Sequence, residues 1–187
     1  AFAAHPERAT LGDFRATAEL IATEAAALAD AAHIVTPHRD IADLFPDKAV
    51  VLEWKLPVSR VTAPSASRRF AFPGPTVARK GAYELREATR ALGLEVVLLG
   101  NELEGPDFWR GVTVRRPNGD TDWLAEVAAV VQPAIVEERP RALLAALAAG
   151  VPVIATPACG IAAQDGVTLV PASETAALLE ALRTVVE

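Results

Sequence analysis

The chain has 187 residues, of which 51% are apolar and 22% charged, and this balance is typical of a globular protein with one core or one core plus part of a second unit. Its net charge of −6 argues against a nucleic-acid-binding surface, and no apolar run is long enough for a membrane span or a signal peptide. A single cysteine, Cys159, excludes an internal disulfide and a cysteine cluster for a metal, so we expect a reducing, cytoplasmic location.

The first 57 residues predict a long helix followed by short strands. Thr10 and Asp13 form the pattern of a capping box that opens the helix, and apolar residues then follow at spacings of three and four. Residues 33–36 and 49–52 predict short strands, with a brief helix over residues 39–45 between them. The apolar stripe of the long helix consists of Leu11, Phe14, Ala18, Ile21, Ala25, Leu28 and Ala32.

A segment rich in proline and serine, residues 58–68, is predicted to be an interdomain linker. From residue 69 to residue 187 strands and helices alternate regularly, with Gly93 and Gly150 ending two helices and Ser173 capping the last one. This alternation predicts an α/β unit with a doubly wound parallel sheet. The expected strands cover residues 70–72, 96–99, 112–114, 128–135, 151–155 and 167–170.

A polar site is expected at the carboxyl ends of these strands. Residues 127–160 have the pattern of strand, acidic turn, helix, strand and glycine-ended loop, and crevices in such βαβ units hold nucleotides or other phosphorylated ligands. Gly74 follows the first strand, where backbone approaches a ligand or another loop. Arg79 and Lys80 stand at the start of the next helix, which predicts a diphosphate site; the alternative is a solvated basic turn.

Residues 70–100 and 127–160 resemble the C-terminal, donor-binding domain of retaining, nucleotide-sugar-dependent glycosyltransferases with the GT-B fold, in the glycosyl transferases group 1 family. The run LAALAAGVPVIATPACG, residues 144–160, is a close match. Residues 24–57 resemble the end of the preceding N-terminal domain. We therefore expect the chain to begin partway through that domain and to lack most of the acceptor-binding part.

The resemblance implies transfer of a sugar, of the hexosyl type, from a nucleotide-sugar to an unidentified acceptor in polysaccharide biosynthesis. It implies no cofactor besides this substrate and no metal ion, and the histidines, His5, His33 and His38, have no metal-ligand spacing. No transmembrane segment and no nucleic-acid partner are expected. Peripheral membrane contact through the missing N-terminal half is left open. Two alternatives stay open: a catalytically inactive binding module on the same fold, and a nucleotide-sugar epimerase.

The resemblance also assigns roles to single residues. Lys80 matches the family's donor-binding lysine, and Glu137 matches the first of two paired glutamates, which implies contact with the donor sugar and a catalytic role. The second glutamate falls on Ala145, and the arginine that usually follows Gly74 falls on Pro75. These two departures motivate the inactive-module alternative.

Further donor-binding residues are expected beside Glu137 and after the following strand. The guanidinium groups of Arg139 and Arg141 supply positive charge that Pro75 does not, and the backbone N–H groups of Arg141 and Ala142 face a phosphate or a sugar. Gly160 and Ile161 correspond to the glycine-rich turn that presents N–H groups to the diphosphate.

Other polar and aromatic residues are expected to have structural roles. His38 reads as a solvated turn histidine, although a catalytic base is the alternative. Cys159 reads as a small buried apolar residue, the alternative being a thiol activated at a helix start. We expect Asn101, Glu102 and Glu104 to lie in a surface loop, and the alternative is that they line the nucleotide pocket. We expect Trp109 and Trp123 to be core or loop anchors.

Overall fold

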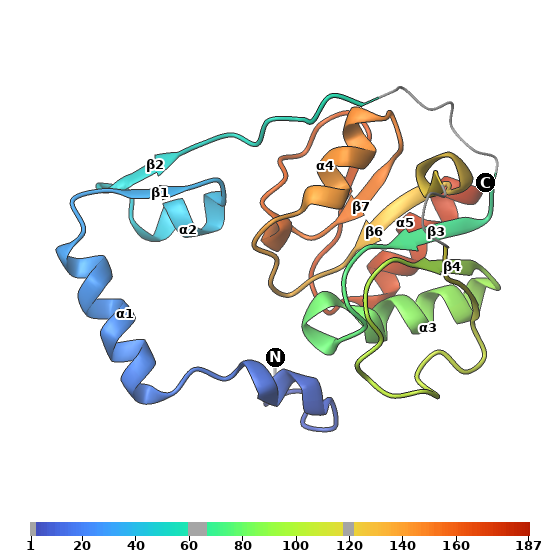
Figure 1. Cartoon of the computed structure of the whole chain (residues 1–187), viewed down its shortest axis with the longest axis horizontal. Helices are drawn as coiled ribbons and strands as arrows, with labels where there is room; N and C mark the ends of the chain where they lie inside the picture. The colour runs from blue at the N-terminus through green and yellow to red at the C-terminus, as the bar shows by residue number, and fades with distance from the viewer. Residues whose placement is uncertain (1–2, 60–66, 118–121) are drawn as a thin grey trace.

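The computed structural model describes residues 3–59, 67–117 and 122–187, and its main body is a six-stranded parallel sheet (Figure 1). The strand order is β5-β4-β3-β6-β7-β8. The predicted α/β class with a doubly wound parallel sheet is confirmed, although the strand expected over residues 128–135 already ends at Gln132. The strands are β3 (Arg69–Phe72), β4 (Glu95–Leu98), β5 (Thr113–Arg115), β6 (Ala129–Gln132), β7 (Val153–Ala155) and β8 (Val167–Leu169).

Helices cover both faces of this sheet and bury two apolar layers. Phe70 and Phe72 belong to the layer that includes α3 (Ala82–Leu92) and α5 (Thr175–Val186), whereas Ala71 belongs to the layer under α4 (Arg141–Ala148). Successive residues of a strand point to opposite faces, so burial on both sides explains why the strands are continuous apolar runs.

Several residues of these layers had been anticipated. Trp109 is buried in the first layer together with Leu178 and Leu182 of α5, and Trp123 packs against the other layer, so both tryptophans are core anchors as expected. Gly93 ends α3 with a φ of 61°, as expected for a glycine C-cap.

The direction of winding reverses between β3 and β6. The chain runs from β3 outward through β4 to β5, and then returns to the other side of β3 and runs outward from β6 through β7 to β8. The connections after β3 and β6 therefore diverge to opposite sides of the sheet. In doubly wound sheets such a reversal leaves a crevice at the carboxyl ends of the two neighbouring strands.

The N-terminal part of the chain, residues 3–59, contains a second, smaller sheet, and we call this part the N-terminal unit. It contains η1 (Ala9–Phe14), α1 (Ala18–Asp30), β1 (Ile34–Thr36), α2 (Arg39–Leu44) and β2 (Ala49–Val51), and β1 and β2 pair in parallel as a sheet of their own. In Figure 1, α1 projects away from the large sheet while η1 returns to it near α3. The expected domain limits, with residues 1–57 as the tail of another domain, stay a prediction, and the central linker residues 60–66 lie outside the described residues.

The capping box predicted at Thr10 is wrong. The Thr10 hydroxyl donates to the Glu104 carboxylate and accepts from the backbone N–H of Ala78, so it serves a contact between distant segments. Its segment forms η1, and α1 begins only after Thr17, whose hydroxyl accepts from Leu20 N at 3.2 Å. No residue of α1 is buried. The apolar stripe of α1 therefore faces solvent in the described part of the chain.

Ser173 does not cap the last helix either. The cap position of α5 is Glu174, without a side-chain hydrogen bond to the helix, and Ser173 has a φ of 64°. Among the described residues, no helix combines the length and the apolar character needed to cross a bilayer.

Candidate functional site

A cavity of about 380 Å³ lies at the point where the winding reverses, between the loops after β3 and β6 and the start of α4. We call it the switch cavity. It is the place where doubly wound sheets bind ligands. The structure brings six of the predicted site residues to its wall: Gly74, Lys80, Glu137, Arg139, Arg141 and Ala142.

Glycines allow the loops around this cavity to approach one another. A Cβ on Gly74 would lie 2.9 Å from Gln132 Nε2, and a Cβ on Gly100 would lie 2.3 Å from Gly74 O. Gly81, at the start of α3, has a φ of 77°, and a Cβ there would lie 2.1 Å from Pro133 O. The close approach expected at Gly74 is therefore present, and Gly81 holds the start of α3 against the loop after β6.

Lys80 forms a buried ion pair inside the cavity wall. Its Nζ lies 2.9 Å from Glu137 Oε2 and donates to Val136 O at 2.9 Å, and the Lys80 and Glu137 side chains are only 7% and 13% exposed. The other oxygen of Glu137 accepts from Arg139 N at 3.0 Å. Lys80 is thus no solvated turn residue. Because the pair neutralises its charge, an anionic ligand has to compete with Glu137 for it.

The two arginines occupy the exposed rim. Arg139 and Arg141 are exposed, and α4 begins at Arg141 after a buried Pro140. The backbone N–H of Arg141 already donates to Arg139 O at 2.7 Å, so the expectation that it is free for a ligand is wrong. The N–H of Ala142, in the first turn of α4, has no acceptor within the helix and remains the candidate backbone donor.

Arg79 does not line the switch cavity. Its backbone carbonyl accepts from Ile135 N at 2.8 Å and from Val136 N at 3.4 Å, which ties η2 (Ala78–Lys80) to the loop after β6. The expected adjacency of Arg79 and Lys80 at the ligand is therefore not found. Neighbouring side chains of a tight 3₁₀ turn point in different directions, and only Lys80 points into the switch cavity.

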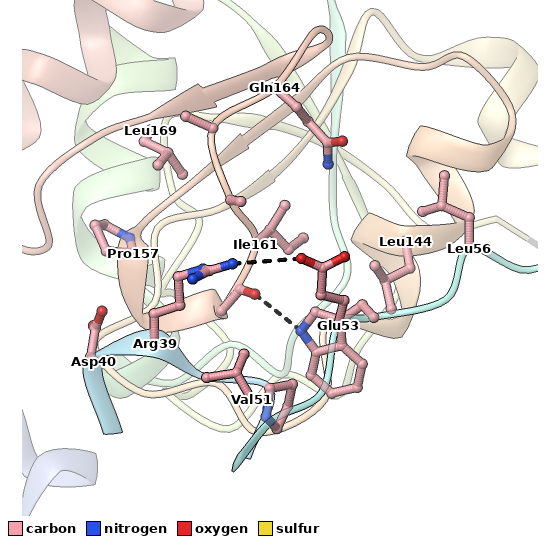
Figure 2. Close-up of a pocket in the computed structure, with 15 residues that line it drawn as sticks. Arg39, Asp40, Val51, Glu53, Leu56, Leu144, Pro157, Ile161, Gln164 and Leu169 are labelled. Carbon is pink, nitrogen blue, oxygen red and sulfur yellow. Dashed lines mark hydrogen bonds and ion pairs between the residues drawn. The ribbon is translucent and has the colours of Figure 1, made fainter. Parts of the chain in front are cut away.

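Gly160 and Ile161 line a second cavity, of about 420 Å³, between the N-terminal unit and the loop after β7 (Figure 2). Within its lining Arg39 pairs with Glu53 at 3.6 Å. The next residue, Trp54, donates from its indole N–H to Gly160 O at 3.1 Å. This cavity joins segments that are more than a hundred residues apart in the chain.

His38 connects a loop beside the first cavity with a loop beside the second. A Cβ on Gly160 would lie 2.6 Å from His38 Nδ1, His38 Nε2 lies 3.3 Å from Glu138 O, and the ring packs edge-on against Trp54. His38 is therefore a partly buried bridge between two loops instead of a solvated histidine. Lys80 and Gly160 follow β3 and β7 at the same edge of the sheet, but they line different cavities.

The end of β6 contains a feature that the sequence analysis missed. Gln132 is 2% exposed, lines the switch cavity, and its Nε2 has no hydrogen-bond partner. The available signal was one polar residue that interrupts the apolar run 127–135. Below it, the Cys159 thiol donates to Gln132 O at 3.4 Å, and burial raises the pKa of that thiol, which excludes the activated-thiol alternative.

The acidic residues after β4 do not reach the switch cavity. Glu102 pairs with Arg116 at 2.6 Å on the surface. Glu104 accepts from Ala78 N and from the Tyr83 hydroxyl, both at 2.9 Å. Burial and this hydrogen bond raise the pKa of Tyr83 to about 12. Within the described parts of the chain, no group of three or more His, Cys, Asp or Glu side chains is arranged to hold a metal ion.

Comparisons with solved structures show the same architecture at low sequence identity. Sucrose-phosphate synthase from Thermosynechococcus elongatus is 18% identical with a TM-score of 0.62, over 81% of this chain and 48% of that one. The lipopolysaccharide outer core galactosyltransferase WaaB is 15% identical with a TM-score of 0.64, over 83% and 53%. HepE from Anabaena, in complex with UDP and glucose, is 16% identical with a TM-score of 0.62, over 84% and 54%.

The chain thus spans about half the length of these structures, and they establish its fold. No curated protein sequence matches it. The model of the family described as glycosyl transferases group 1 matches residues 81–187, which include α3, β6, α4 and the loop after β7. Since this match covers more than half of the chain, the protein belongs to the glycosyl transferases group 1 family.

Proposed function

We propose that this chain binds a nucleotide-sugar in the switch cavity and forms the donor-binding half of an enzyme that transfers the sugar to an unidentified acceptor. The observation that carries the proposal is the position of this cavity, at the reversal of a doubly wound sheet, with two exposed arginines, a buried lysine and a glutamate on its wall. Family membership supports it, and one similar structure, HepE, contains UDP and glucose.

Stabilisation of the leaving group is the chemistry that this wall supports. When the bond between sugar and diphosphate breaks, negative charge develops on the diphosphate, and cations and peptide dipoles fixed beside it lower the barrier. Arg139 and Arg141 lie at the start of α4, whose first turn adds the positive end of the helix dipole. Lys80 adds a third positive charge once its ammonium leaves the Glu137 carboxylate and binds a phosphate oxygen of the donor instead.

Glu137 then becomes available to the sugar. Its second oxygen is held by Arg139 N, which keeps the carboxylate in the cavity wall after the lysine turns away. A carboxylate accepts hydrogen bonds from sugar hydroxyls, and it stabilises the positive charge of an oxocarbenium-like transition state. The proposal further includes hexosyl specificity, retention of configuration, independence from metal ions and a cytoplasmic location. Activity in the presence of EDTA tests the independence from metal ions.

Thermal denaturation with a panel of nucleoside diphosphates tests donor binding. A ligand at 100 times its Kd stabilises the folded state by about 2.7 kcal/mol. Replacing Arg139 and Arg141 together with alanine should reduce that stabilisation, because both rim charges are lost. The matched control replaces Arg110 and Arg183, which are surface arginines paired at i,i+3 with acidic neighbours and distant in sequence from the cavity wall. Equal binding by the rim variant and the control would contradict the assigned role of the rim.

A catalytically inactive binding module is the second candidate function. Ala145 stands where the family has its second glutamate, Pro75 replaces an arginine, and the cation of Lys80 is already neutralised. A transfer assay decides between the two candidates, provided that it uses the protein together with the half that the similar structures possess. Donor that binds but is never consumed, with any acceptor or with water, would favour the module. The epimerase alternative gains no support, since the family is one of transferases.

A further inference from the structure

The amide of Gln132 is an unusual group for the floor of a cavity. The residue is 2% exposed, yet its Nε2 has no hydrogen-bond partner. A buried amide without a partner is unfavourable, because the group loses its hydrogen bonds to water, and almost all buried polar groups in proteins are paired. Because an apolar residue of the same size would avoid this cost, the exception requires an explanation.

The surroundings of the amide indicate what it is placed to meet. Gln132 closes β6 and lines the switch cavity. Its Nε2 would lie 2.9 Å from a Cβ on Gly74, and Lys80 Cγ would lie 3.3 Å from the same point. The absent side chain of Gly74 thus leaves the amide and the lysine stem next to each other, below the loop that follows β3.

The floor and the rim of the cavity differ in charge. The rim has the two exposed guanidinium groups, which suit an anion. The floor has a neutral donor, Gln132, and a carboxylate acceptor, Glu137, whose charge is balanced by the buried Lys80 ammonium; Leu143 and Pro73 also line the cavity. A neutral donor together with an acceptor matches the hydroxyl groups of an uncharged sugar ring, because each hydroxyl both donates and accepts a hydrogen bond.

We propose that Gln132 is a sugar-recognition residue: its amide donates a hydrogen bond to a hydroxyl oxygen of the donor's sugar while the diphosphate stays with the rim cations. This inference rests on the proposed function and deepens it. It explains the unpaired Nε2, since the missing partner is supplied by the ligand. It also predicts discrimination among sugars, because a ring that lacks this hydroxyl leaves the amide buried and unpaired.

The experiment compares the wild type with Gln132→Met, a substitution of similar size without the amide. Gln164→Met is the control, since Gln164 is the other glutamine of the chain, is exposed and lines the second cavity. Affinities are measured for UDP, GDP and ADP and for UDP-glucose, GDP-mannose and ADP-glucose. For the nucleotide that the wild type binds, Gln132→Met should weaken the nucleotide-sugar about tenfold, the size of one hydrogen bond, and leave the nucleoside diphosphate unchanged.

Other results overturn the inference in distinguishable ways. If Gln132→Met weakens the nucleotide-sugar and the nucleoside diphosphate equally, the amide contacts the diphosphate. If neither affinity falls, the amide has no role in donor binding. If the wild type binds none of the six ligands, the proposed function fails and this inference fails with it.

A measurement without ligand adds an independent test. Since the unpaired amide is unfavourable in the free protein, Gln132→Met should melt at the wild-type temperature or above it. A clear fall in Tm, absent in Gln164→Met, would show that Gln132 has a structural role and would refute the proposal.

Discussion

Removing the ammonium group of Lys80 tests whether the buried ion pair is as important to the fold as its geometry indicates. In Lys80→Met the Glu137 carboxylate keeps its buried position and loses its counter-ion. Breaking a buried pair in this way destabilises proteins by about 3–5 kcal/mol. With side chains that are 7% and 13% exposed, we expect the lower end, about 3 kcal/mol. For a chain of this length that corresponds to a fall in Tm of roughly 6–12 °C.

The chain offers a control with the same distance and a different environment. Arg110 and Asp107 also lie 2.9 Å apart, but their side chains are 79% and 77% exposed. Arg110→Ala should therefore change stability by less than about 1 kcal/mol. The double variant Lys80→Met/Glu137→Gln should recover much of the loss, because no unpaired charge remains buried. Chemical denaturation of the four proteins measures these values, and similar losses for Lys80→Met and Arg110→Ala would refute the reasoning.

Three further predictions concern the framework of the site. Tyr83 is the one tyrosine of the chain, so its phenolate absorbance reports its titration, which should occur near pH 12 in the folded protein. Glu104→Gln should lower that pKa, because the charged hydrogen-bond partner is lost. A folded-state midpoint near pH 10 would contradict the burial argument. Because its pKa is raised, the stability that neutral Tyr83 contributes is present below about pH 10 and is lost as the pH rises toward 12. Gly93→Ala should lower the free energy of unfolding by about 1 kcal/mol, because its φ is left-handed and the new Cβ meets nothing within 4 Å. Gly81→Ala should lower it by about 1–3 kcal/mol more, because its Cβ also meets Pro133 O. Equal melting temperatures for the two variants would refute the contact. Cys159 should resist alkylation at pH 8 until the protein is unfolded, since burial raises its pKa, and rapid labelling of the folded protein would show that the thiol is accessible.

The sequence by itself determined the large sheet and the neighbourhood of the site. Apolar runs of four or more residues predict strands buried on both faces, and glycines such as Gly93 mark helix ends, because both signals depend on local preferences and on burial. Their alternation places the loops after β3 and β6 at one sheet edge, so Lys80 and Glu137 could be predicted to lie near each other. The resemblance to a family added the roles expected of these residues.

Only the tertiary structure decided how the polar groups pair. Lys80 and Glu137 are 57 residues apart, and His38 and Glu138 are 100 apart, so no local pattern shows that the first two form an ion pair or that the imidazole covers Gly160. Thr10 has the sequence of a helix cap, yet its hydroxyl is used by a contact 94 residues away. The residues that flank Gln132 in the sequence do not indicate whether its side-chain amide has a hydrogen-bond partner. Hydrogen bonds and ion pairs act over about 3 Å, so their partners depend on how folded segments meet in space, which short stretches of sequence do not encode.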